Sequence, residues 1–165
     1  MADMDAFTGR LDPDMCVVTA ASGGERAGCL VGFASQCSLR PVRFVVWLSE
    51  ANQTFRVARS ARFLAVHLLA REQLGLAELF GGRTGDDGVD KFRDVRWRQG
   101  YGGAVVLQDS EAYFVGRVVG HAGGSDHIGF ILDPVEWGAR EGSGEPLLRL
   151  SDARRIEPGH PVERT

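Results

Sequence analysis

The sequence has almost no lysine: Lys91 is the only lysine among its 19 Lys and Arg residues. The net charge is −3, so no general positive charge would attract nucleic acid, and none is expected as a partner. The excess of arginine is typical of a biased genomic composition. Some of these arginines could still serve an anionic ligand, because a guanidinium group binds phosphate through two parallel hydrogen bonds.

Long apolar runs are also missing. No segment approaches 18 apolar residues, so no membrane span is expected. The first ten residues are acidic and do not resemble a signal peptide, which predicts a cytoplasmic protein. The three cysteines, Cys16, Cys29 and Cys37, match no zinc-binding spacing. We therefore expect free thiols in a reducing compartment, acting as small buried apolar side chains.

Several chemical motifs are absent. Gly81–Gly85 lacks the Gly-Lys-Ser/Thr of a P-loop, and no GxGxxG follows a strand, which disfavours Walker and Rossmann sites. No local pattern resembles a nucleophile with its base, which leaves a hydrolase without support. The four histidines show no metal-ligand spacing, so no metal is expected; they are His67, His121, His127 and His160.

The pattern that is present consists of short apolar segments separated by turn residues. At 165 residues and 44% hydrophobic content, one domain is expected. The candidate strands are Cys16–Ala20, Arg26–Gly32, Arg43–Leu48, Phe63–Leu69, Val95–Arg98, Ala104–Leu107, Ala112–His121, Asp126–Leu132 and Leu147–Leu150. The candidate helices are 3–11, 54–62 and Glu72–Phe80, with one helical turn at Val89–Phe92. These short strands, joined mainly by hairpins, predict a mainly β fold, an antiparallel barrel with two or three peripheral helices.

Three features could bind a ligand. From Arg26 to Pro41, a strand is expected to turn into a loop of small residues whose backbone N–H groups are free. The segment Trp47–Thr54 leaves a buried strand and brings hydroxyls and amides to a helix start, where Thr54 is the expected N-cap. This segment could bind an anion or serve only as a cap. His127 follows Asp126 at a strand start, and is either a turn residue or held in one tautomer at a pocket rim.

The order of these pieces resembles the flavin reductase-like family with the FMN-binding split-barrel fold. The resemblance covers about Asp12 to Glu136. Its residues are Gly28, Ser38-Leu39-x-Pro41, the strand Phe63–Leu69, Gln73 with Leu76–Phe80, Asp90-Lys91-Phe92 and Asp126-His127. It implies a split-barrel domain over 12–150, an N-terminal helix or arm over 1–11 and a tail over 151–165. Members are typically the small NAD(P)H:flavin reductase partners of two-component monooxygenases.

The resemblance also implies a site. His127 would lie where the nicotinamide approaches. The implied cofactor-binding residues are Arg26, Ala27, Gly28, Cys29, Leu30, Gly32, Phe33, Trp47, Leu48, Ser49, Asn52, Gln53, Thr54 and Phe80. The family often has Gly-x-Thr-x-Ser-Ser-Phe in the opening loop, whereas this chain has Gly28-Cys29-Leu30-Val31-Gly32-Phe33-Ala34. Because those hydroxyls are missing, main-chain N–H groups, or Ser35 and Gln36, are expected to replace them.

The implied function is hydride transfer from NADH or NADPH to FMN, with FAD as a second flavin. Such a transfer needs stacked rings and excluded water more than an acid or base. The reduced flavin would go to a monooxygenase, and a homodimer is expected. Two alternatives stay open: a protein of the same fold that uses a deazaflavin, another donor or its own substrate, and a flavin carrier or sensor without turnover.

Overall fold

The computed structural model describes residues 3–82 and 90–154, and most of its regular structure is strand. The strands are β1 (Cys16–Ser22), β2 (Glu25–Val31), β3 (Ala34–Leu39), β4 (Val42–Ser49), β5 (Phe63–Leu68), β6 (Trp97–Gln99), β7 (Val105–Leu107), β8 (Ala112–Ala122) and β9 (His127–Ala139). The helices are α1 (Asp5–Thr8), α2 (Gln53–Ala58), α3 (Leu74–Gly81) and α4 (Leu150–Ala153), with a short 3₁₀ turn, η2 (Tyr101–Gly103).

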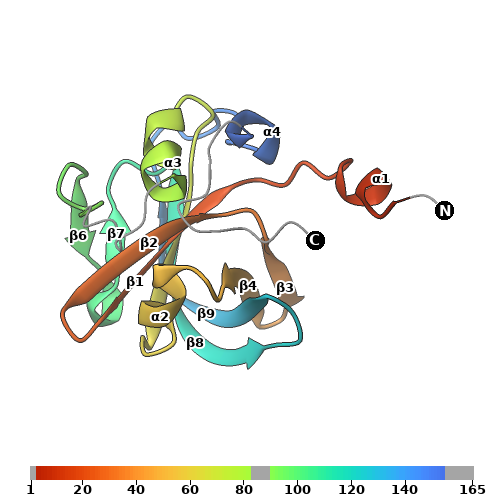
Figure 1. Cartoon of the computed structure of the whole chain (residues 1–165). Coiled ribbons are helices and arrows are strands. Elements are labelled where there is room, and N and C mark those ends of the chain that lie inside the picture. The colour runs from red at the N-terminus through yellow and green to blue at the C-terminus, as the bar shows by residue number, and fades with distance from the viewer. Residues whose placement is uncertain (1–2, 83–89, 155–165) are drawn as a thin grey trace.

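Seven of these strands form one antiparallel sheet in the order β2-β1-β5-β8-β9-β4-β3, and β6 pairs with β7 in a separate hairpin. The two end strands, β2 and β3, follow each other in the chain and are joined by Gly32 and Phe33. The sheet curls so that its ends come near each other, without a ladder between them among the described residues (Figure 1). The predicted split barrel of antiparallel strands is therefore confirmed.

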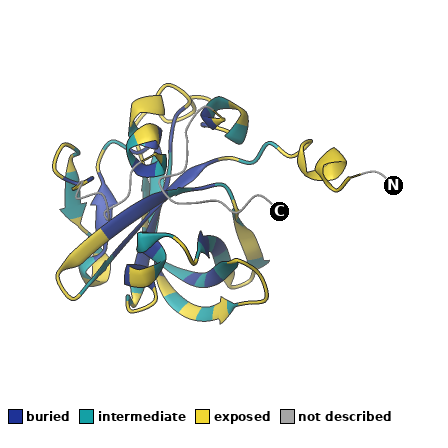
Figure 2. Ribbon diagram, viewed as in Figure 1, coloured by how far each residue is buried: buried dark blue, intermediate teal, exposed yellow. Residues whose placement is uncertain are grey.

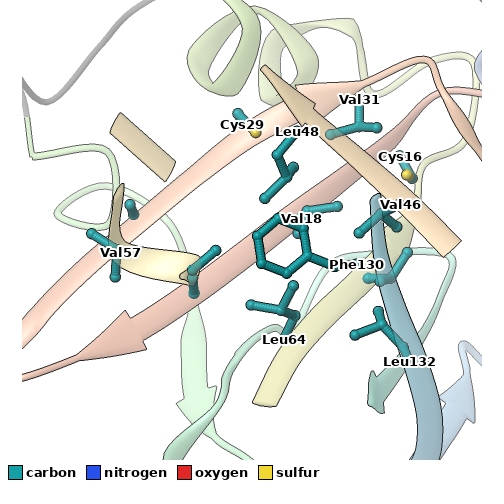
Figure 3. Close-up of a cluster of buried hydrophobic side chains, with 14 residues drawn as sticks. Cys16, Val18, Cys29, Val31, Val46, Leu48, Val57, Leu64, Phe130 and Leu132 are labelled. Atoms are coloured by element: carbon teal, nitrogen blue, oxygen red, sulfur yellow. The ribbon is translucent and has the colours of Figure 1, made fainter. Parts of the chain in front are cut away.

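The inside of the barrel is filled by apolar side chains from β1, β2, β4, β5 and β9, and α2 packs against them. Figure 3 shows Phe130 near the middle of this cluster, with Val18, Leu64 and Leu132 around it. Fully burying a side chain of this size contributes about 1.5–3 kcal/mol, so this cluster is a major source of stability.

A second apolar layer covers the outside of the barrel. Met15 and Val17 of the β1 region pack with Phe80 of α3, Leu107 of β7 and Ala153 of α4. The buried side chain of His67 joins this layer to the sheet: its Nδ1 lies 2.9 Å from the Val17 carbonyl, and its Nε2 accepts the Leu107 N–H at 3.0 Å. Both ring nitrogens of His67 therefore have partners inside the protein.

The segment expected to be a loop before Pro41 is instead the edge strand β3. Its residues are mostly exposed, and only β4 pairs with it. A strand without a buried face lacks the alternation of apolar and polar residues from which strands are predicted. The register with β4 also shifts between Gln36 and Ser38, which marks a bulge on this edge.

Two further expectations about strands were wrong. The strand expected to end at Leu132 does not stop before Pro134: β9 continues to Ala139, and a register shift at Val115–Gly116 lies opposite the proline. A bulge tolerates a proline because a residue there needs no ladder hydrogen bond. Leu147–Leu150 forms no strand, since Leu147 makes only an isolated bridge with Ala70 and Leu150 begins α4.

The N-terminal helix is shorter than the expected 3–11. It covers only Asp5–Thr8 and buries no side chain; Met4, Phe7 and Leu11 are 64%, 61% and 51% exposed. Figure 2 shows this segment exposed and extending away from the barrel. None of the described helices has the length and apolar character needed to cross a membrane.

The other helices also differ at their ends. α2 stops at Ala58 instead of Arg62, and α3 begins at Leu74, two residues after Glu72. The expected loop Gly81–Gly88 lies largely outside the described residues, as does Val89 of the expected turn before Phe92. His160 and most of the expected 151–165 tail also lie outside them.

Candidate functional site

The ends of β4 and β9 bring four of the predicted site residues together. Ser49 pairs with His127 in the β4–β9 ladder. The Trp47 N–H donates to the Phe33 carbonyl at 2.9 Å, and the Phe33 ring meets the His127 ring edge-on at 5.2 Å. We call this group, Phe33, Trp47, Ser49 and His127, the rim. Because Phe33 is 60% exposed, the rim offers an aromatic surface to a ligand.

Local contacts fix two of the three rings of the rim, those of Trp47 and His127. The Trp47 ring lies against Gly129 of β9, where an added Cβ would be 2.9–3.1 Å from three ring carbons. The His127 Nδ1 lies 2.7 Å from a carboxylate oxygen of Asp126. This hydrogen bond holds the pKa of the Asp126 carboxyl below its ordinary value, so a carboxylate faces Nδ1 at neutral pH. In a neutral imidazole, such a partner favours the tautomer with the proton on Nδ1 and the lone pair on Nε2.

Helix α2 begins beside the rim, but its cap differs from the prediction. Asn52 is the N-cap: its side chain accepts the Thr54 N–H at 2.9 Å, and its own N–H donates to the Ser49 carbonyl. Thr54 is the second residue of α2 and is 1% exposed. Its hydroxyl hydrogen-bonds to the buried Cys29 thiol of β2. Asn and Thr are both common N-cap residues, so the sequence alone does not distinguish Asn52 from Thr54. The structure does, because the helical backbone begins directly after Asn52.

A second group of predicted residues is buried between β2 and α3. The Phe80 ring lies on the backbone of Gly28, where an added Cβ would be 2.7 Å from Phe80 Cε1 and 3.4 Å from Phe92 Cζ. The Lys91 ammonium donates to the Gly28 carbonyl at 3.0 Å and to the Phe80 carbonyl at 3.2 Å. We call this group, Gly28, Phe80, Lys91 and Phe92, the seam.

Arg26 lies at the exposed end of β2 next to the seam. Its guanidinium group stacks over the Trp97 ring, 4.6 Å from the centroid, and Trp97 in turn meets Phe92 edge-on at 6.3 Å. Arg26 is therefore a cation at the surface end of an aromatic series that leads into the seam.

The remaining predicted residues lie in or near the barrel wall. Ala27, Cys29 and Leu48 are buried in the inner core, so only their main chain could meet a ligand. Leu30 packs against the outer layer, and Gly32 lies beside the Met15 sulfur. Gln53 is partly buried in the first turn of α2. The structure thus gathers six of the predicted residues into the rim and the seam. The Cys29–Thr54 hydrogen bond links β2 beside the seam to helix α2, which begins beside the rim.

Sequence reasoning named Lys91 only within the family pattern Asp90-Lys91-Phe92 and gave it no role. The structure places its side chain 7% exposed at the centre of the seam. The signal that could have drawn attention to it is that the chain has no other lysine.

The cysteines take no part in thiol chemistry at neutral pH inside the barrel. Burial raises the pKa of Cys16 to about 12 and that of Cys29 to about 11. Cys37 on β3 is exposed, contrary to the expected burial of all three. All three thiols are free. Within residues 3–82 and 90–154, no three His, Cys, Asp or Glu side chains gather in a way that could bind a metal.

A surface hollow of about 470 Å³ lies between α3 and the β6–β7 hairpin, and none of the predicted site residues lines it. Its walls include the ion pair of Arg96 with Asp109 as well as Glu72 and Asp94. Because none of the predicted residues lines this hollow, we give it no part in the site.

Comparisons with known proteins agree with the resemblance. The family described as "Flavin reductase like domain" matches residues 8–156. "FMN reductase (NADH) RutF 1" of Methylorubrum extorquens is 30% identical over 153 residues, which cover 92% of this chain and 74% of that protein.

Two solved structures share the fold. The NADH:FAD oxidoreductase SgcE6 of Streptomyces globisporus, in complex with NAD and FAD fragments, superposes with a TM-score of 0.80 at 19% identity, covering 93% of both chains. Nitrilotriacetate monooxygenase component B from Mycobacterium thermoresistibile superposes with a TM-score of 0.73 at 19% identity, covering 81% of this chain and 73% of that one.

Proposed function

The chain belongs to the flavin reductase-like domain family, and we propose that it is an NAD(P)H-dependent flavin oxidoreductase that transfers a hydride from NADH or NADPH to FMN, with FAD as a second flavin. The observation that supports this most strongly is the rim, where β4, β9 and the link between β2 and β3 place two aromatic rings, a hydroxyl and an oriented imidazole side by side. Such a surface suits two flat heteroaromatic rings, because stacking and orientation are the main requirements of hydride transfer.

The chemistry of these donors fits a flavin. When bound, the flavin supplies the hydride-accepting ring nitrogen. Trp47 and Phe33 would flank the ring, and Ser49, Asn52 and Gln53 would face the polar side chain and phosphate. Thr54 would act from beneath this surface, because its hydroxyl faces Cys29.

The β2 strand would contribute through its main chain. Ala27, Gly28 and Cys29 have no exposed side chain, which fits a contact made by backbone groups in place of the missing hydroxyls. Leu30, Gly32, Leu48 and Phe80 would support this surface from the core and the outer layer. Arg26 supplies positive charge near the strand's exposed end.

We assign His127 the place where the nicotinamide approaches. Asp126 and the Phe33 ring hold the imidazole in one orientation, and Nε2 points its lone pair away from the carboxylate. The role is one of position, since hydride transfer requires no proton at this atom.

We further propose that the protein forms a homodimer in the cytoplasm and passes reduced flavin to a monooxygenase. Leu39 and Val42, 78% and 50% exposed on the β3–β4 hairpin, are apolar surface that a second copy could cover. Free thiols are typical of a reducing compartment. The fold shared with a monooxygenase component supports such an acceptor.

Titration with FMN and FAD tests flavin binding, because binding should quench the flavin fluorescence and raise the melting temperature of the protein. Loss of nicotinamide absorbance with NADH or NADPH then tests turnover. If neither flavin changes the fluorescence or the melting temperature, the flavin proposal fails. Binding without oxidation of either nucleotide would leave a carrier or a protein with another donor.

A further inference from the structure

The seam contains a buried cation that the proposed reaction does not use. The Lys91 side chain is 7% exposed and donates to two main-chain carbonyls, at Gly28 and Phe80. Its ammonium also lies 5.8 Å from the centroid of the Phe80 ring. A buried ammonium is costly unless hydrogen bonds compensate it, so these partners define its position closely.

The two carbonyls belong to elements that no sheet ladder joins. Gly28 lies on β2, the last strand at its end of the sheet, with only β1 as a neighbour. Phe80 lies in the last turn of α3, where carbonyls lack an intrahelical partner and a cation is favourable. Lys91 therefore ties a strand at the split of the barrel to the end of a helix.

Lys91, Phe80 and Phe92 together form a clamp that restricts the movement of the Gly28 peptide. The Phe80 ring lies so close on one side of it that an added Cβ would be 2.7 Å from Cε1, and Phe92 adds a second ring. The positive charge of Lys91 also acts on Cys29, the residue after Gly28. It lowers the pKa of the Cys29 thiol, although burial raises that pKa by more.

We propose that Lys91 is a positioning residue of the flavin site. It fixes the Gly28–Cys29 main chain of β2 against α3, so that this strand is already in place when the flavin ring binds. The inference rests on the proposed function, because it concerns the same site. It makes Lys91 act on the ring through β2, without contact with the phosphate.

The test uses Lys91→Met, which keeps an unbranched side chain and removes the ammonium. Dissociation constants are measured for FMN and for riboflavin, which lacks the phosphate, at a temperature well below the melting point. Both affinities should fall by about tenfold or more, because the clamp acts on the ring-binding strand. The absorption bands of the bound flavin should shift equally for the two ligands.

Val106→Ala controls for lost stability, since Val106 is 1% exposed in a separate apolar cluster between β7 and the sheet. Its flavin affinities should stay within about twofold of the wild type. If Lys91→Met does not fold, Lys91→Gln, which keeps one amide donor, replaces it and should show the same equal loss.

Unchanged affinity for both ligands would overturn the inference, and so would a loss confined to FMN, which would mean direct contact with the phosphate. Loss of affinity in Val106→Ala equal to that in the Lys91 variant would also overturn it. Failure of the proposed function is a different result, because the wild-type protein would then bind neither flavin.

Discussion

The rim and the seam are built in opposite ways. The rim is open, and the strand register of β4 and β9 brings its side chains together with Phe33 60% exposed. The seam is closed: Phe80 is 1% exposed and Gly28 offers only backbone. Changes in the rim should therefore alter chemistry with little effect on folding. Changes in the seam should alter both, because the same contacts hold the strand and the protein.

The largest expected effect on the free energy of unfolding comes from His67, which lies between β5 and β7. Burial lowers the pKa of His67 to about 4, whereas an unfolded chain gives about 6.5, so protonation favours the unfolded state. Its stabilisation is complete above pH 6.5 and is lost as the pH falls toward 4, by about 3 kcal/mol in total. Urea unfolding from pH 7.5 to 4 measures the loss. If His67→Gln lost as much unfolding free energy between pH 7.5 and 4 as the wild type, His67 would not be the cause of the loss.

Gly28→Ala tests how closely the seam is packed. The new Cβ would lie 2.7 Å from Phe80 Cε1, so the free energy of unfolding should fall by about 2 kcal/mol, with weaker FMN binding. Gly75→Ala is the matched control, because a Cβ there meets nothing within 4 Å and lies in α3. That variant should be more stable by about 0.5–1 kcal/mol. Equal stability of the two variants would show that the seam is not tightly packed.

His127→Ala tests the rim. We expect turnover of NADH to slow by about tenfold because the nicotinamide loses an oriented neighbour. FMN affinity should be kept, and unfolding should change by no more than about 0.5 kcal/mol. Steady-state kinetics with saturating FMN measure the effect, with His121→Ala as an exposed histidine control. Kinetics identical to the wild type would remove His127 from the site.

Thr54→Val examines the hydrogen bond that links β2 beside the seam to α2 beside the rim. The substitution keeps the shape and removes the bond to Cys29, and should cost about 1 kcal/mol of folding free energy. Asn52→Ala should cost a similar amount by removing the cap. Both are read by thermal and urea unfolding with FMN titration. Because we place Thr54 beneath the proposed ligand surface, its change should weaken FMN binding as well; an unchanged affinity would limit its role to folding.

The parts of the fold that the sequence predicted are those with strong local patterns. The run of apolar residues in Phe63–Leu69 and the β-branched residues after Cys16 both form strands. The edge strand β3 was missed because its residues are mostly exposed. Pro134 misled the prediction of β9, because the bulge that accommodates it depends on the partner strand.

The site was predicted by the order of motifs, but its internal arrangement depends on contacts between distant elements. Ser49 and His127 are 78 positions apart and meet only through the β4–β9 register. Lys91 meets Gly28 across 63 positions and Phe80 across 11. No local sequence pattern predicts such contacts. A lysine within a short family motif could therefore not be given a position or a role from the sequence.

The measurement that tests the central proposal most directly is a single reduction under anaerobic conditions. Protein saturated with FMN is mixed rapidly with NADH, and in parallel with NADPH, while the flavin absorbance near 450 nm is followed. We expect bleaching with at least one nucleotide at a rate far above that of the same flavin without protein, and a slower rate in His127→Ala. Bleaching with both nucleotides no faster than in buffer would contradict the account.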